Sequence, residues 1–295
     1  MSGDHEKKVD RPLAPGLYLV ATPIGNLEDI TLRALRVLRS VDRIACEDTR
    51  QTLKLLNHFE IHTPTVSYHM HNEGSRTEEL VAELKAGARI AVVSDAGTPG
   101  IADPGGQIAA AAISAGIDLF PIPGANAAIS GLIASGLPTE QFIFHGFLAA
   151  KAGQRKTSLE KIIRGQATHV FYEAPHRILD TLADVEAVFG QSQHVVVARE
   201  LTKLHEEFLR GPVGELRSQL AARASVRGEI VLMFTLSPTE NSSGTKGASL
   251  AVEVAALMKS DGIGEMDALK RVARERGIGK SEAYRELQRE QNRLR

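Results

Sequence analysis

The stretch SDAGTPGIADPG, residues 94–105, gathers glycines, prolines and aspartates into one loop between two regular elements. The apolar segment before it, residues 89–94, is expected to form a strand, and the alanine-rich segment after it, residues 105–115, a helix. Loops that join a strand to a helix in this way are where open α/β sheets bind ligands. Glycine lets the backbone approach a ligand closely, proline stiffens the loop, and Asp95 and Asp103 supply acceptors or negative charge. We therefore predict a ligand site at this loop rather than a plain tight turn.

Short β-rich runs alternate with helical stretches on both sides of this loop. A capping box of Ser75 and Glu78 predicts the start of one of these helices. The alternation implies a mainly parallel sheet with helices on its faces. Besides the two elements above, we expect strands at residues 16–22, 42–46, 64–68 and 118–122, and helices at residues 27–40, 49–59 and 75–86.

A second series of strands and helices begins after Gly124, with connections that look more hairpin-like. The economical interpretation is two α/β domains, residues 16–123 and 124–236. The second contains expected helices at residues 125–135 and 177–189, and expected strands at residues 141–147, 168–172, 194–198, 206–210 and 229–236.

The two ends of the chain differ from this pattern. Residues 1–15 form a polar tail, and residues 237–249 are rich in Ser, Thr, Gly, Asn and Pro, which is typical of a flexible linker. Residues 250–295 contain three short helical patterns, 250–260, 264–276 and 281–293, and the turn at 276–280 joins the last two as in a helix-turn-helix. From Lys270 to Arg295 nine residues are basic and four acidic. A solvated helix pair and a nucleic-acid-binding unit both remain open.

Composition limits the class of protein. The chain has 295 residues, 43% of them hydrophobic, and a formal net charge of -1, so any contact with nucleic acid must come from a local patch. The single cysteine, Cys46, excludes an internal disulfide framework and fits a reducing compartment. No apolar run approaches the roughly 18 residues of a membrane span, and the N-terminus lacks a signal-peptide core. We expect a soluble, cytoplasmic α/β protein.

Two phosphate-binding fingerprints are missing. The turn TPIGNL at residues 22–27 is not GxGxxG, and the chain has no GxxxxGK[ST], which argues against dinucleotide and P-loop ligands. His69 and His71 lack partners at ligand spacing, so no metal site is predicted. A ligand without phosphates suits the loop better.

Six segments together carry a resemblance. Besides residues 94–105 they are YLVATPIGNLEDIT at 18–31, CEDTR at 46–50, FYEAPHR at 171–177, RELTK at 199–203 and GEIV at 228–231. The chain resembles the tetrapyrrole methylase superfamily, the class III S-adenosylmethionine (SAM) methyltransferases. Within it, the chain is most similar to the subfamily that methylates a ribose 2′-oxygen of small-subunit ribosomal RNA. The resemblance spans about residues 16–236, and Ala102 departs from it where the family usually has Ser or Asn.

The resemblance implies two α/β domains with a SAM cleft between them, and a small C-terminal helical domain. It also implies a homodimer, a substrate cytidine in the decoding centre of 16S rRNA, free or in the 30S subunit, and chemistry without a metal. SAM would contact Asp95, Ala96, Gly97, Ile101, Pro123, Gly124, Ala125, Phe147, Tyr172, Gly228 and Glu229.

Methyl transfer from SAM to a hydroxyl needs alignment and help for the departing proton. Loops at strand ends offer Glu173, Glu200 and Lys203 as candidates for that help, and transfer by positioning alone stays open. Two other interpretations remain: a tetrapyrrole C-methyltransferase and a non-catalytic SAM- and RNA-binding assembly factor. The candidates for binding RNA phosphates are Arg50, Arg177, Arg199 and, in an expected loop after Phe147, Lys151, Arg155 and Lys156.

Overall fold

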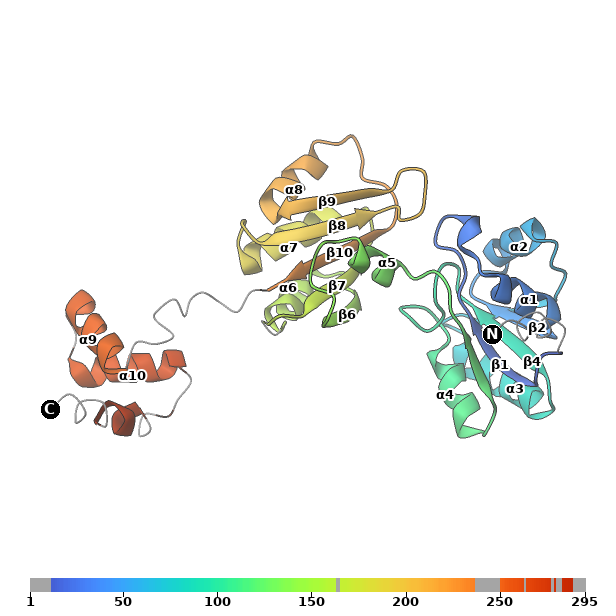
Figure 1. Cartoon of the computed structure of the whole chain (residues 1–295), viewed down its shortest axis with the longest axis horizontal. Coiled ribbons are helices and arrows are strands. Elements are labelled where there is room, and N and C mark those ends of the chain that lie inside the picture. Colours follow the sequence, from blue (N-terminus) through green and yellow to red (C-terminus); the bar gives the residue numbers. More distant parts are fainter. Residues whose placement is uncertain are drawn as a thin grey trace, which may run out of the picture. The chain divides into compact units, whose positions relative to one another are not determined.

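The structure is a computed structural model that describes residues 12–162, 165–236, 250–262, 264–276, 279 and 283–288. These residues fall into two compact units that divide after Leu236 (Figure 1). The predicted linker at 237–249 and most of the predicted N-terminal tail lie outside the described residues.

The first sheet of the larger unit is parallel throughout, as the sequence predicted. Its strand order is β3-β2-β4-β1-β5. A short 3-10 turn, η2 (Leu27–Asp29), precedes the first helix. The strands are β1 (Gly16–Val20), β2 (Arg43–Cys46), β3 (Thr65–Ser67), β4 (Arg89–Val93) and β5 (Leu119–Ile122), and the helices are α1 (Leu32–Ser40), α2 (Thr49–His58), α3 (Glu73–Lys85) and α4 (Gly106–Ser114).

Alternate residues of these strands point to opposite faces, and each face has its own apolar core. Leu38 of α1 and Leu56 of α2 pack with Ile44 on one face. Leu80 of α3 and Ile108 of α4 pack on the other. The sheet therefore separates α1 and α2 from α3 and α4.

The second sheet has the order β6-β7-β10-β8-β9, and only its β6–β7 pair is parallel. Residues of α6, α7 and α8 pack in one apolar core of this sheet, and α5 packs in another that also includes Ile24 from the turn after β1. The strands are β6 (Phe142–Phe147), β7 (Thr168–Glu173), β8 (His194–Arg199), β9 (Glu207–Pro212) and β10 (Ile230–Thr235), and the helices are α5 (Ala127–Ile133), α6 (Ala152–Glu160), α7 (Ile178–Phe189) and α8 (Val213–Ala221).

Some local predictions were wrong. The segment predicted as a loop after Phe147 contains α6, and α8 was not predicted at all. The expected helix at residues 27–40 is divided, because Thr31 is extended and its side chain caps α1 by accepting from the Ala34 amide. The capping box was also wrong: α3 begins at Glu73, and Ser75 lies inside it.

The smaller unit contains α9 (Leu250–Asp261) and α10 (Glu265–Arg276), and residues 283–288 are also helical. Leu250, Leu269 and Leu287 belong to its apolar core. Most of the predicted turn at 276–280 and both ends of the third predicted helix lie outside the described residues. Over the described part of the chain, no helix has the length and apolarity needed to cross a membrane.

A buried ion pair holds α6 against α7. Arg155 of α6 is only 3% exposed, and its Nε lies 2.6 Å from Oδ2 of Asp184 on α7. Its Nη1 also donates to the carbonyl oxygens of Ala149 and Ala150. These contacts leave Arg155 inside the protein, which corrects its prediction as an RNA-binding residue.

The pair predicts an asymmetric effect of substitution. Asp184→Asn leaves the buried Arg155 charge without its carboxylate, so the free energy of unfolding should fall by about 3–5 kcal/mol in urea denaturation. Lys156→Gln is the matched control, because Lys156 faces the same carboxylate at 3.5 Å from a half-exposed position. We expect the control to lose less than about 1 kcal/mol, and equal losses would contradict a special role for the buried pair.

Candidate active site

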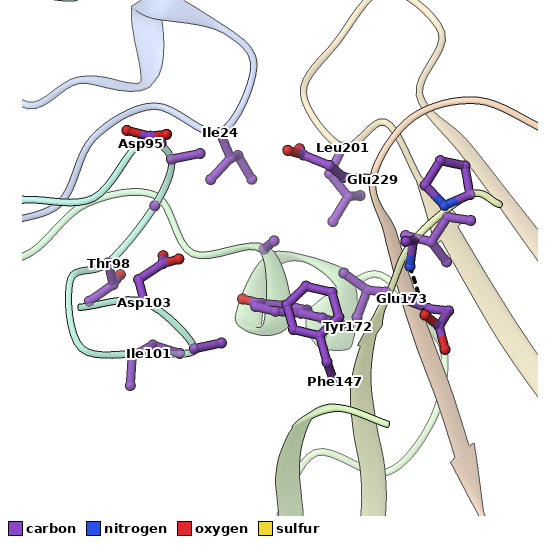
Figure 2. Close-up of a pocket in the computed structure, with 18 of the residues that line it drawn as sticks. Ile24, Asp95, Thr98, Ile101, Asp103, Phe147, Tyr172, Glu173, Leu201 and Glu229 are labelled. Carbon is purple, nitrogen blue, oxygen red and sulfur yellow. Dashed lines mark hydrogen bonds between the residues drawn. The ribbon is translucent and has the colours of Figure 1, made fainter. Parts of the chain in front are cut away.

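The loop at residues 94–105 forms one wall of a cavity of about 370 Å³ (Figure 2). Residues in and after strands of both sheets line it, so it collects segments that are far apart in the sequence. On the side of the first sheet the lining is Ile24, Glu47, Asp95, Ala96, Gly97, Thr98, Ile101, Ala102 and Asp103; the rest is Ala127, Phe147, Tyr172, Glu173, Ala174, Pro175, Leu201, Glu229, Ile230 and Val231.

Backbone hydrogen bonds fix this loop to the turn that follows β1. The Thr22 amide donates to the Gly97 carbonyl at 2.8 Å, and the Gly97 amide donates to the Thr22 carbonyl at 3.0 Å. Gly97 has φ +84°, and a Cβ there would lie 3.3 Å from Cγ2 of Ile24. A side chain at this position would therefore be strained and would crowd the cavity wall.

Three carboxyl groups gather on this side of the cavity. Burial raises the pKa of Asp103 to about 6, and the nearby Glu47 and Asp95 add to the effect. Burial, reinforced by Asp95, also raises the pKa of Glu47. Among the described residues, none of the three takes part in a salt bridge, and no cluster of His, Cys, Asp or Glu is arranged to hold a metal ion. The wall is thus poised to accept a cationic ligand.

The opposite wall is apolar and aromatic. Figure 2 shows the rings of Phe147 and Tyr172 beside each other, facing the wall formed by Ile101 and Asp103. Their ring centroids are 5.7 Å apart. The Tyr172 hydroxyl accepts a hydrogen bond from the Ala128 amide, and this bond holds the ring in place. This surface suits the hydrocarbon or ring portion of a ligand.

Glu173 borders the cavity, but both of its carboxylate oxygens have partners. Oε1 accepts from the Ala174 amide at 2.8 Å, and Oε2 accepts from the Thr181 hydroxyl at 2.6 Å. The Arg177 guanidinium lies 3.3 Å from Oε1 and donates to two carbonyl oxygens, those of Leu148 and Ala149. Glu173 and Arg177 therefore stabilise the turn into α7, which leaves little capacity for a reacting group.

Lys203 lies between two carboxylates. Its Nζ is 2.8 Å from Oε1 of Glu200 and 3.1 Å from Oε2 of Glu229. Burial lowers the pKa of Lys203, but its bonds to the two glutamates outweigh burial and the net shift is upward. The bond from Lys203 likewise lowers the pKa of Glu200. In this arrangement Lys203 remains a cation and Glu200 an anion.

Two glycines make room for this cluster. A Cβ on Gly25 would lie 2.3 Å from Cγ of Lys203, and a Cβ on Gly228 would lie 2.2 Å from the Glu200 side chain. Glu200 and Thr202 have positive φ angles of 54° and 64°, so the loop after β8 carries local strain. Such strain is typical of segments that position functional groups.

The predicted cofactor residues divide into two groups. Seven line the cavity: Asp95, Ala96, Gly97, Ile101, Phe147, Tyr172 and Glu229. The other four, Pro123, Gly124, Ala125 and Gly228, do not line it. Of these, Gly124 lies against Ala21, and the Ala125 carbonyl accepts from the Thr98 hydroxyl, so both support the loop.

Sequence reasoning missed several apolar lining residues, among them Ile24, Leu201 and Val231. Ile24 and Leu201 follow strand ends within quoted motifs, but nothing in the sequence separates an apolar core residue from one that faces a cavity. The position of Ile24 and Leu201 within those motifs was the one feature of the sequence that could have identified them as lining residues.

The predicted RNA-binding residues lie in different environments. The Arg50 side chain is 86% exposed and pairs with Asp48, while Lys151 and Lys156 lie at the surface near the start of α6. Arg199 is largely buried, with bonds to Glu207 and to the Arg227 carbonyl. The side chains of Arg155, Arg177 and Arg199 thus already bind carboxylates and carbonyl oxygens within the protein.

Asp103→Asn tests the burial of the acidic wall in the ligand-free protein. The folded-state pKa of Asp103, about 6, lies above the ordinary value of 3.8, so folding favours the protonated carboxyl. That contribution to stability is fully present below about pH 4 and is lost as the pH rises through about 6. The variant stays neutral, so its Tm relative to the unchanged protein should increase from about pH 5 to about pH 8. Asp180→Asn, at an exposed site on α7, is the matched control. A pH profile for Asp103→Asn that does not differ from the profile of the control would contradict the assignment.

Curated relatives match most of the chain. "Ribosomal RNA small subunit methyltransferase I" of Halalkalibacterium halodurans is 48% identical over 273 residues, which cover 91% of this chain and 93% of that protein. The protein of the same name from Synechocystis sp. is 46% identical over 270 residues, covering 91% and 95%. The one from Escherichia coli O157:H7 is 50% identical over 218 residues, covering 74% and 76%.

Solved structures show the same fold. A diphthine synthase aligns with a TM-score of 0.58 at 14% identity, covering 74% of this chain and 89% of its own. A uroporphyrin-III-C-methyltransferase from Thermus thermophilus aligns with a TM-score of 0.53 at 22% identity, covering 75% and 94%. The family of tetrapyrrole (corrin/porphyrin) methylases matches residues 16–217. The chain therefore belongs to the tetrapyrrole methylase family and, within it, to the group of ribosomal RNA small subunit methyltransferases I.

Proposed function

We propose that this chain transfers a methyl group from SAM to the ribose 2′-oxygen of a cytidine in the decoding centre of 16S rRNA. The observation that carries the proposal is the cavity itself, which has acidic groups on one wall, aromatic groups on the other and the Lys203 cluster at its border. The relatives named above are small-subunit rRNA methyltransferases, and they favour RNA over a tetrapyrrole as the substrate.

The cavity fits SAM. When bound, SAM supplies a methyl group activated by a positively charged sulfonium. Asp95 and Asp103 face the cavity and would attract its cationic sulfonium and amino groups, while Phe147 and Tyr172 would hold its apolar portions. The proposed cofactor residues are the seven lining residues, with Pro123, Gly124, Ala125 and Gly228 as supporting ones.

The residues of this chain would mainly align the reactants and stabilise charge. A ribose hydroxyl loses its proton as it is methylated, so negative charge develops on its oxygen. Lys203 is held protonated by Glu200 and Glu229, and it is therefore suited to stabilise that charge rather than to remove the proton. Glu173, with both oxygens engaged, would shape the wall. Positioning and the Lys203 cation are the two contributions that the geometry favours.

The proposal also includes the division of the chain into domains. It comprises two α/β domains that divide near Gly124, a cofactor cleft between them and a helix-turn-helix-like C-terminal domain. A homodimer, a cytoplasmic location and the 30S subunit as the form of the substrate rest on the family resemblance alone.

The direct test is methyl transfer from labelled SAM to 16S RNA and to 30S subunits from cells that lack the protein. We expect one ribose-methylated cytidine in the decoding region, mapped by mass spectrometry. SAM binding without transfer to either form of the RNA would overturn the proposed reaction and favour a non-catalytic role or a different acceptor.

Lys203→Met tests the role of the cation. Loss of a charge that stabilises the transition state should lower kcat by about 10²- to 10³-fold. The dissociation constant of SAM should change little, because Lys203 does not line the cavity. Lys85→Met, which removes an exposed cation at the end of α3, is the control. An unchanged kcat in Lys203→Met would exclude this role.

A further inference from the structure

Helices α1 and α2 carry five cations and no carboxylate. The cations are Arg33, Arg36 and Arg39 on α1, and Arg50 and Lys54 on α2. The two helices cover the same face of the first sheet, and Nη2 of Arg39 donates to the carbonyl of Phe59 at the end of α2, at 2.9 Å (Figure 1). The outer surface of these two helices is the α1–α2 face, and Arg33, Arg39, Arg50 and Lys54 are exposed on it.

The opposite side of the same sheet has the reverse charge. Helix α3 carries four glutamates against Arg76 and Lys85, and α4 carries no charged residue. The first sheet therefore separates a basic face from an acidic or neutral one. A chain with a net charge of -1 acquires a cationic surface in this way.

Most of these cations are not neutralised within the protein. Arg33 and Arg39 donate to backbone carbonyls, and Lys54 donates to the amide oxygen of Gln51 at 2.8 Å. Within the described ranges, no salt bridge involves Arg33, Arg36, Arg39 or Lys54, and only Arg50 pairs with a carboxylate, that of Asp48. Carboxylates flank the two helices in the sequence, at Glu28 and Asp29 before α1, at Asp42, Glu47 and Asp48 between the helices, and at Glu60 after α2, but none lies within either helix.

A second cavity opens beside this face. It has a volume of about 420 Å³, and Gln51, Lys54 and Leu55 of α2 contribute to its lining together with residues of the turn after β1. It shares Asp95, Ala96 and Glu229 with the proposed cofactor cavity. The two cavities therefore adjoin each other at these three residues.

We infer that the RNA backbone lies over the α1–α2 face and that the target nucleotide enters the second cavity. This deepens the proposed function, on which it rests. Phosphates need exposed cations that no carboxylate neutralises, and Arg33, Arg39 and Lys54 meet that need. Arg155, Arg177 and Arg199 do not, because they are buried or half-buried and pair with carboxylates. Methyl transfer needs the ribose oxygen and the methyl group close together, and two adjoining cavities would place their ligands next to each other.

The test is a double variant, Arg39→Gln with Lys54→Gln, in the full chain. Its matched control is Lys85→Gln with Lys161→Gln, which also removes two exposed cations but from other surfaces. Binding to 16S RNA and to 30S subunits is measured against salt concentration, and SAM binding is measured separately to show that each variant is folded. The slope of log affinity against log salt should fall by about 2 for the first variant, and KM for RNA should rise. The control should keep the slope of the unchanged protein.

The outcomes separate this inference from the proposed function. If the unchanged protein binds SAM but methylates no RNA, the proposed reaction fails. If it methylates RNA and both double variants behave alike, the RNA does not use the α1–α2 face and the inference is overturned. If the first variant loses self-association and keeps RNA binding, the face belongs to a contact with a second copy of the chain, which also overturns the inference.

Discussion

The pair of backbone hydrogen bonds between Thr22 and Gly97 is the constraint on which the site depends. It joins the turn after β1 to the loop after β4, and these two segments supply Ile24, Asp95 and Asp103 to the cavity. The turn also continues to Gly25 and Asn26, and the Asn26 amide donates to the Thr202 hydroxyl next to Lys203. These two hydrogen bonds thereby hold in place the acidic wall of the cavity and one side of the Lys203 cluster.

Electrostatics divide the first half of the larger unit into an acidic interior site and a basic outer face. Burial, reinforced by Glu47 and Asp95, raises the pKa of Asp103, so ionising this carboxyl carries a cost that binding of a cation would offset. The cations of α1 and α2 lie outside that wall, and Lys54 is the one that reaches the second cavity. A cationic small molecule and a polyanion can then be bound close together without competing for the same groups.

The arginines show how well a sequence motif predicts which side chains are available to bind RNA. Arg177 and Arg199 stand in quoted segments and Arg155 in the expected loop after Phe147, and all three are engaged inside the protein by carboxylates and carbonyl oxygens. A buried guanidinium needs such partners because an unpaired charge is costly to bury. The exposed arginines of α1 belong to an ordinary amphipathic helix and gave no motif to notice. Only the packing of the helices showed which arginines remain available.

The sequence by itself determined the alternation of strands and helices in the first sheet, its parallel character and the loop at residues 94–105, which lines the cavity. These features follow from local patterns of apolar residues, glycine and proline, which act within a few residues. Helix α6 escaped prediction because its apolar periodicity is weak and its stability comes from Leu159 and the Arg155–Asp184 pair. Which residues line the cavity, which carboxyl groups meet and which cations stay exposed depended on segments distant in the chain. Tertiary structure decided these features, because burial and pairing are properties of neighbours in space and not of neighbours in sequence.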